Sequence, residues 1–189
     1  MTRPDYRDAL ARSGVMEVLA PFSPHLVGTP PLGIAMPDSD LDIVCEVRDG
    51  DAFIRTLTDN FSAMAGFALR RHDELDAIIC GFVAHGWAFE IFGQPIPVTR
   101  QHGWRHYEVE RRLLTLGGGI LRHEINILRN QGLKTEPAFG RLLGLNGDPY
   151  AALLELERQD DDALRELIHR QRKRRAEILP PPDPRINPE

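Results

Sequence analysis

Cysteine is scarce in this 189-residue chain, which contains only Cys45 and Cys80. Both lie in apolar runs, and neither has a second cysteine or a histidine at metal-ligand spacing. This scarcity disfavours a zinc ribbon and a disulfide framework, and it fits a reducing compartment. Since 42% of the residues are hydrophobic and 27% are charged, we expect an ordinary core that needs no covalent or metal staples.

Long apolar runs and an excess of basic residues are also missing. No run approaches the roughly 18 residues that a membrane-spanning helix needs. The first residues, MTRPDYRD, lack the apolar stretch of a secretory signal. The formal net charge of −5 argues against general binding to nucleic acids or anionic membranes. We therefore expect a soluble cytoplasmic protein with no membrane partner, for which nucleic acid is a disfavoured partner.

Apolar periodicity predicts a mixed α/β arrangement in the first half of the chain. Residues 41–47 alternate apolar and polar side chains and include β-branched residues, as a half-buried strand does. The expected elements are a helix over 4–20, a strand and tight loop over 25–34, a strand over 41–47, a helix over 50–63, and an antiparallel meander of strands over 67–71, 77–84 and 87–92.

The second half of the chain has helical periodicity. The expected helices cover 104–116, 120–131, 137–145, 149–156 and 163–178. Glycines 117–119 cost about 1 kcal/mol each inside a helix, so they predict a hinge or corner. Asp148 and Pro149 form a helix start signal, an N-cap followed by proline.

These signals divide the chain into three parts. A core over 1–116 precedes a helical module over 117–178. The Pro-rich tail over 179–189 is expected to be disordered.

The clearest chemical signal is a pair of carboxylates at the head of the strand over 41–47. Asp40 and Asp42 are two residues apart, so both project from one face while Leu41 and Ile43 enter the other. Two like charges on one face repel unless a cation joins them. Hard oxygen ligands at this spacing suit Mg²⁺, which takes its other ligands from water and substrate phosphates.

A phosphate cradle is predicted just upstream of these carboxylates. Gly28 and Thr29 follow a short strand and offer backbone N–H groups and a hydroxyl at a turn. Glycine lets the backbone approach a ligand closely, so this turn is suited to a phosphate.

This stretch resembles the signature of the polymerase-beta-type nucleotidyltransferase superfamily. The signature is Gly-Ser followed about ten residues later by two acidic residues with one apolar residue between them. Here Gly28-Thr29, then Gly33, precede Pro37-Asp38-Ser39-Asp40-Leu41-Asp42 at the same spacing. The segments GLKTEP over 132–137 and GDPY over 147–150 are similar to a bacterial family of unknown function assigned to that superfamily. The resemblance implies an α/β (α+β) fold, with a nucleotidyltransferase-like mixed sheet flanked by helices over 1–116 and a C-terminal helical module.

The resemblance also implies residue roles. Asp40 and Asp42 would hold one or two Mg²⁺ ions on a nucleoside triphosphate. Gly28 and Thr29 would contact its phosphates, and Ser39 belongs to the same nucleotide-binding signature.

A third carboxylate on a neighbouring strand usually completes such a site and activates the acceptor hydroxyl. Glu90 is the best candidate, because a charge in an otherwise apolar strand needs a partner or a metal. Asp76 is the rival candidate.

Two departures from the superfamily pattern concern the phosphate loop. Thr29 replaces the usual serine, and Pro30 and Pro31 stiffen the loop and remove two N–H donors. Positions 30–32 also lack the basic residue often seen there. A catalytically inactive module that keeps the fold and binds nucleotide or a protein partner is therefore an alternative.

The helical segments carry weaker candidates. Arg105 recurs with Gln101, His106 and Glu110 at helical spacing, where it would bind a triphosphate or the acceptor. A solvated helix face with intrahelical pairs is the favoured interpretation of these residues. Lys134 would neutralise phosphate charge, and its place before a helix start fits a surface capping residue equally well.

We therefore hypothesise Mg²⁺-dependent transfer of a nucleoside monophosphate from a triphosphate to an acceptor hydroxyl, with release of pyrophosphate. The acceptor is a small molecule, a protein or an RNA. The competing hypotheses are the inactive module and a metal-dependent phosphohydrolase. The phosphohydrolase lacks support because the His-Asp clusters of such sites are missing.

Overall fold

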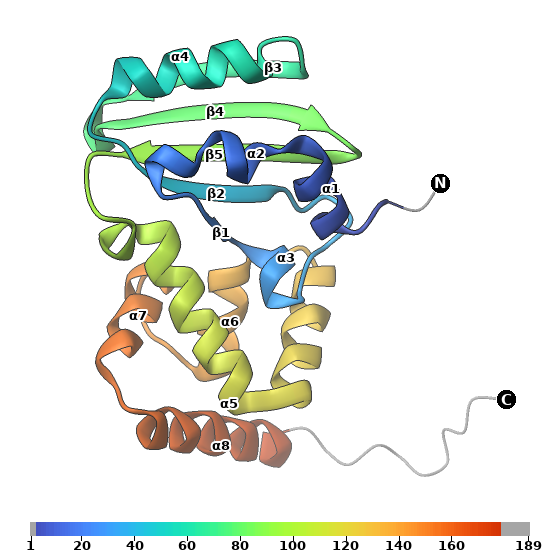
Figure 1. Cartoon of the computed structure of the whole chain (residues 1–189). Coiled ribbons are helices and arrows are strands. Elements are labelled where there is room, and N and C mark those ends of the chain that lie inside the picture. The colour runs from blue at the N-terminus through green and yellow to red at the C-terminus, as the bar shows by residue number, and fades with distance from the viewer. Residues whose placement is uncertain (1–2, 179–189) are drawn as a thin grey trace, which may run out of the picture. The chain divides into compact units, whose positions relative to one another are not determined.

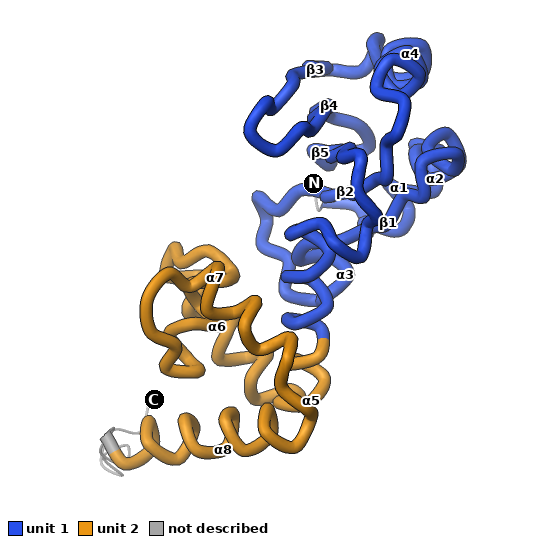
Figure 2. Tube along the Cα trace, turned by 90° about the vertical axis from the view of Figure 1, so that its left-hand side faces the viewer, with its two compact units in different colours: residues 1–111 blue, residues 112–189 orange. Residues whose placement is uncertain are grey.

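The computed structural model describes residues 3–178, so the prediction of a disordered tail over 179–189 lies outside the described residues. Contacts divide the chain into two compact units, residues 1–111 and 112–189 (Figure 2). The expected division into a core over 1–116 and a helical module over 117–178 stays a prediction. Across residues 3–178, every helix is too short or too polar to cross a membrane.

Unit 1 contains a five-stranded mixed sheet in the order β1-β2-β5-β4-β3 (Figure 1). Its strands are β1 (His25–Val27), β2 (Leu41–Glu46), β3 (Ala65–His72), β4 (Ala77–Ala84) and β5 (Trp87–Gln94). β3, β4 and β5 form the predicted antiparallel meander. β5 then pairs with β2 in parallel, and β2 pairs with β1 antiparallel. The parallel β2–β5 pair therefore occupies the middle of the sheet.

Three helices pack on one face of this sheet. They are α1 (Tyr6–Ser13), α2 (Val15–Val18) and α4 (Gly50–Phe61). Their apolar side chains join the main core of unit 1 with alternate residues of the strands, among them Leu41, Ile43 and Cys45. Cys45 thus shares a strand face with Leu41 and Ile43, as the alternation predicts.

The single helix expected over 4–20 is wrong. Gly14 has φ +61° and separates α1 from α2. The apolar pattern does not reveal this break, because Ala9, Val15 and Leu19 are all fully buried on both sides of it. α1 begins at an N-cap, where the Asp5 carboxylate accepts a 2.8 Å hydrogen bond from the Arg7 N–H.

The opposite face of the sheet carries a smaller core. Val27, Val44 and Val98 are buried there, and two aromatic residues of helix α5 (His102–Asn130), Trp104 and Tyr107, pack against them. Between β5 and α5 lie a 3₁₀ turn over Val98–Arg100 and the residue Gln101.

Gln101 shows that the expected solvated helix face is wrong at that position. Its side chain is 1% exposed. Its amide donates hydrogen bonds to the Cys45 carbonyl at 2.8 Å and the Ile96 carbonyl at 3.1 Å. Gln101 therefore fastens the end of β2 to the segment that leads into α5.

Unit 2 is helical, as predicted. After the later turns of α5 come α6 (Thr135–Leu143), α7 (Pro149–Glu155) and α8 (Asp161–Ile178), and α6 contacts both α7 and α8. α5 is interrupted at Gly118, whose φ of 61° and ψ of −155° are not helical, so the predicted hinge is confirmed as a kink. The predicted N-cap is also present, since the Asp148 carboxylate accepts from the Ala151 N–H at 2.9 Å.

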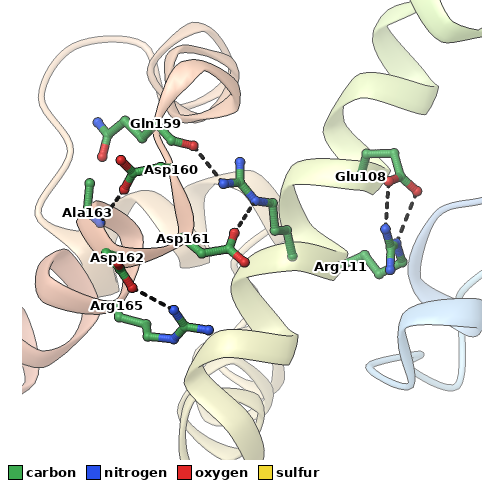
Figure 3. A network of polar contacts seen from close by, with 9 residues as sticks. Glu108, Arg111, Gln159, Asp160, Asp161, Asp162, Ala163 and Arg165 are labelled. Atoms are coloured by element: carbon green, nitrogen blue, oxygen red, sulfur yellow. Dashed lines mark hydrogen bonds and ion pairs between the residues drawn. The ribbon is translucent and has the colours of Figure 1, made fainter.

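The charged helix α8 is tied to the rest of unit 2 at both ends. At its start, the Arg112 side chain contacts the Asp161 carboxylate and the Gln159 carbonyl, both at 2.7 Å (Figure 3). Near its end, Arg175 contacts the Glu124 carboxylate at 2.9 Å and donates to a backbone carbonyl of α6. These contacts give α8 a structural role.

Candidate functional site

Asp42 and Glu90 lie directly beside each other in the middle of the sheet. The register of the parallel β2–β5 pair matches Asp42 with Glu90. Residues in register on neighbouring strands point to the same face. Since Leu41 and Phe89 enter the main core, both carboxylates project from the opposite face.

Asp40 extends this carboxylate pair toward the start of β2. It stands one residue before the strand and is half-buried, like Asp42, whereas Leu41 between them is fully buried. This alternation is the one predicted for two carboxylates on one side of the chain. Asp40, Asp42 and Glu90 thus form an acidic group on one face of the sheet.

The backbone of Gly28 lies against the Asp42 carboxylate. Gly28 follows β1, whose last residue, Val27, pairs with Asp42. A Cβ atom at Gly28 would lie 2.2 Å from the Oδ2 atom of Asp42. Its φ of 74° and ψ of −162° are also open to glycine and strained for other residues. Two independent constraints, the backbone angles and the lack of space, therefore require glycine here. The close approach places the predicted phosphate turn beside the Asp42 carboxylate.

Thr29 and Ser39 meet beside this turn. The Thr29 hydroxyl donates to the Ser39 hydroxyl at 3.0 Å, and Ser39 Oγ accepts from the Met36 N–H at 2.8 Å. The Ser39 N–H donates in turn to the Met36 carbonyl at 3.0 Å. Ser39 is buried, and in this arrangement it joins the predicted phosphate turn to the loop that carries Asp40.

Glu90 is open to solvent on its other side. Gly81 of β4 pairs with Glu90, and Ala68 of β3 pairs with Gly81, so small side chains stand along this row. The Glu90 side chain is 45% exposed, and it forms an ion pair with Arg70 of β3 in which the nitrogen and oxygen are 3.8 Å apart. An exposed pair of this length contributes little to stability, so Glu90 is available to another cation.

The rival third carboxylate lies elsewhere in unit 1. Asp76 precedes β4, has φ +45° and is exposed. It lines a polar pocket with Val47 and Gly93, which stand at the far ends of β2 and β5. The register therefore pairs Asp42 with Glu90 and leaves Asp76 at the other end of the sheet.

Of the two basic candidates, one lies on a helix and the other directly precedes one. Arg105 belongs to the first turns of α5, next to Trp104, whose ring meets His25 edge-on at 4.8 Å. Lys134 belongs to unit 2, where it is exposed and its carbonyl accepts from the Ala138 N–H at the start of α6. Among the predicted site residues, the structure groups Gly28, Thr29, Ser39, Asp40, Asp42 and Glu90.

Two arginines that the motif search missed also contact this group. Arg70 pairs with Glu90, and the Arg3 guanidinium reaches the loop before Asp40. Strand alternation places Arg70 on the same face as Ala68, so the alternating pattern of this strand could have indicated on which face Arg70 lies. Nothing in the sequence near Arg3 indicates a contact 36 residues away.

The group has the donor chemistry of a hard-cation site. Three carboxylates supply only oxygen ligands, which Mg²⁺ prefers. Asp42 and Glu90 carry like charges on adjacent strands, so a bound cation would relieve their repulsion. A phosphate at the Gly28 turn would stand beside the same cation.

The fold resembles solved nucleotidyltransferases. The Cid1 poly(U) polymerase bound to MgATP matches with a TM-score of 0.54 and 10% identity, over 79% of this chain and 47% of that one. A cytoplasmic RNA terminal U-transferase matches with a TM-score of 0.50 and 11% identity, over 78% of this chain and 43% of that one. The chain thus spans less than half the length of these neighbours. At such identities the likeness shows the fold alone, and it confirms the expected nucleotidyltransferase-like mixed sheet flanked by helices.

No curated protein matches the chain. The family model of a domain of unknown function, DUF4269, matches residues 8–156, which include the whole sheet and the acidic group. This match covers well over half of the chain, and the chain belongs to the DUF4269 family.

Proposed function

We propose that this protein transfers a nucleoside monophosphate from a nucleoside triphosphate to an acceptor hydroxyl, in a Mg²⁺-dependent reaction that releases pyrophosphate. The observation that carries the proposal is the Asp42–Glu90 register pair with the Gly28 backbone against Asp42. The nucleotidyltransferase fold supports it, because it gives this acidic group the same kind of scaffold.

Asp40, Asp42 and Glu90 would hold the metal. Their oxygen donors suit Mg²⁺, and the missing Cβ of Gly28 leaves the Asp42 carboxylate close to a backbone turn. When bound, one or two Mg²⁺ ions would neutralise phosphate charge and stabilise the attacking and leaving oxygens.

Gly28 and Thr29 would bind the triphosphate. Pro30 and Pro31 have no N–H, so the donors that remain at the head of the turn are the Gly28 and Thr29 amides and the Thr29 hydroxyl. That hydroxyl now donates to Ser39, and it would turn to the phosphate on binding. Arg105 and Lys134 remain candidates for the outer phosphates or the acceptor.

Glu90 would accept the acceptor's proton. The acceptor oxygen forms a bond to the α-phosphorus, and the bond from that phosphorus to the oxygen bridging to the β-phosphorus breaks. The electron pair leaves with pyrophosphate, and the hydroxyl proton passes to the Glu90 carboxylate. Its exposure on the open side of the sheet allows an acceptor to reach it.

The acceptor class stays open among small molecules, proteins and RNA. Names such as poly(U) polymerase and RNA terminal U-transferase connect the structural neighbours with RNA. This chain covers less than half of those neighbours and carries a net charge of −5, which favours a less anionic acceptor.

The alternative is a module that binds nucleotide without catalysis. It is favoured by one observation, the two prolines that remove N–H donors from the phosphate turn.

Label transfer tests the proposal. The protein is incubated with Mg²⁺ and each of the four α-³²P-labelled triphosphates, with itself, total RNA or hydroxyl-bearing antibiotics as acceptor. We expect label in one acceptor and an equal amount of pyrophosphate, both abolished by Asp42→Asn and kept by the control Glu46→Gln, which alters a carboxylate at the other end of β2. Release of inorganic phosphate alone would instead indicate a phosphohydrolase, and no product would favour the inactive module.

A further inference from the structure

We infer that Arg3 is a positioning residue for the acidic group: it fastens the loop over Met36–Ser39 and so fixes where Asp40 stands. This inference rests on the proposed function, since it assigns Arg3 a part in forming the metal site. Arg3 lies far from the acidic motif in the sequence and is not one of the predicted site residues.

The Arg3 guanidinium binds three carbonyls of this loop. It donates to the Pro37 carbonyl at 2.8 Å, to the Met36 carbonyl at 3.4 Å and to the Ser39 carbonyl through its second Nη. The planar fork of an arginine suits such divergent acceptors, whereas a lysine offers one compact group. Arg3 therefore holds the loop at three points along its length.

Trp87 holds the guanidinium in place. The Arg3 Cζ atom lies 3.2 Å from the centre of the Trp87 ring, a stacked cation–π contact. The indole N–H donates to the Pro4 carbonyl at 3.0 Å, so the next residue of the chain is fastened to the same ring. Gly86, with φ +80°, passes so close that a Cβ there would lie 3.1 Å from Pro4 Cδ. Arg3 and Pro4, called the N-terminal arm here, thus lie against the β4–β5 turn and the first residue of β5.

The loop that Arg3 holds is already joined to the phosphate turn. Ser39 receives the Thr29 hydroxyl through its side chain and the Arg3 guanidinium through its carbonyl. Asp40 is the next residue, so rotation of the Ser39–Asp40 peptide would move the Asp40 carboxylate. Arg3 restrains that peptide through its carbonyl, and Thr29 restrains the Ser39 side chain.

Charge adds to this arrangement. Burial lowers the pKa of Arg3, while the carboxylates of Asp40 and Asp38 raise it. Asp40 is thus close enough to interact electrostatically with the guanidinium. Arg3 faces the backbone of the loop, which leaves the Asp40 carboxylate to a metal ion.

The first arm of the test is hydrogen exchange in the intact protein without ligand. Arg3→Ala should speed exchange of the Met36 and Ser39 amides, which close the loop. Arg3→Lys should do so as well, because it keeps the charge and loses the fork. The matched control is Arg7→Ala, because Arg7 also lies over an aromatic ring, that of Tyr6. Its ion pair is with Asp5 and not with the loop, so this variant should leave exchange of the loop amides unchanged. Unchanged exchange in both Arg3 variants would overturn the inference.

The second arm is a Mg²⁺ titration of thermal stability, with the triphosphate that stabilises the wild type. Residues that orient metal ligands typically change affinity 10- to 100-fold, so we expect the Mg²⁺ midpoint to rise about tenfold or more in Arg3→Ala. A merely structural role would lower the melting temperature with and without Mg²⁺ and leave that midpoint unchanged. A wild-type midpoint retained in Arg3→Ala would overturn the inference and leave the proposed function standing. A wild type that shows no Mg²⁺ response would overturn both.

Discussion

At the scale of single residues, the site depends on what stands on either side of Asp42. Val27 and Glu90 pair with it from the neighbouring strands, and Gly28 lies against its carboxylate. Since no side chain except that of glycine fits at position 28, the packing of this one carboxylate fixes the course of the preceding turn. The contact offers a direct test.

Gly28→Ala should destabilise the protein more than the same substitution does at another glycine with positive φ. A strained backbone costs about 1–3 kcal/mol, and at Gly28 the added Cβ also displaces the Asp42 carboxylate, so we expect the free energy of unfolding to fall by about 2 kcal/mol or more. The control is Gly14→Ala, since Gly14 has φ +61° with open space around its Cβ position and should cost about 1 kcal/mol. Urea unfolding measures both, and equal losses would contradict the contact with Asp42.

Glu90→Gln should impair turnover more than nucleotide binding. A positioned proton acceptor contributes about 100-fold or more to rate, so we expect kcat for pyrophosphate release to fall by about that factor with a smaller change in nucleotide affinity. The control Asp76→Asn alters an exposed carboxylate at the other end of the sheet and should keep its activity. Full activity of Glu90→Gln with loss in Asp76→Asn would reverse the assignment.

The two thiols should be unreactive in the folded protein. Burial raises the pKa of Cys45 and of Cys80 to about 12. The neutral thiols favour the folded state below the unfolded pKa, about 8.5, and this contribution is lost as pH rises toward 12. At pH 8 a maleimide should therefore label neither cysteine until urea unfolds the chain. Rapid labelling of the native protein would show that the main core of unit 1 opens.

At the scale of elements, helix starts and turns can be predicted from residues that are close together in the sequence. The start of α7 is the clearest case, because the Asp148 carboxylate accepts from the Ala151 N–H and Pro149 fills the first helical position. Both residues satisfy the helix end without help from distant parts of the chain.

Asp148→Ala should lower the free energy of unfolding by about 1 kcal/mol, the usual cost of losing an N-cap. Asp148→Asn is the matched control, because its side-chain oxygen can still accept the hydrogen bond. Chemical unfolding followed by circular dichroism measures the loss. If alanine were as stable as asparagine here, the cap would have no part in holding α7.

Local patterns predicted the strands, the meander and the Gly118 kink because each depends on residues close in sequence. They failed at Gly14, where the apolar pattern continues through a break that only backbone geometry reveals. The register that sets Glu90 beside Asp42 joins residues 48 positions apart, and alternation alone leaves such a pairing undetermined. Arg3 lies further still from any local signal, since its role depends on the β4–β5 turn that seats it.

At the scale of the whole molecule, one compact unit holds the whole acidic group. Unit 1 contains the sheet, the predicted phosphate turn and the N-terminal arm, and unit 2 contains the helices that follow. The family match over residues 8–156 includes the sheet and reaches into unit 2 through α7. The account of this protein depends on the proposed binding of metal and nucleotide by this acidic group.

Thermal unfolding of the wild type, Asp42→Asn and Glu46→Gln with each of the four triphosphates, with and without Mg²⁺, tests that property most directly. A ligand at 100 times its dissociation constant stabilises by about 2.7 kcal/mol, which corresponds to a shift of about 5–10 °C for a chain of this size. We predict such a shift with at least one triphosphate. It should depend on Mg²⁺, be kept in Glu46→Gln and be lost in Asp42→Asn. A shift that persists in Asp42→Asn, or no shift with any triphosphate, would contradict the account.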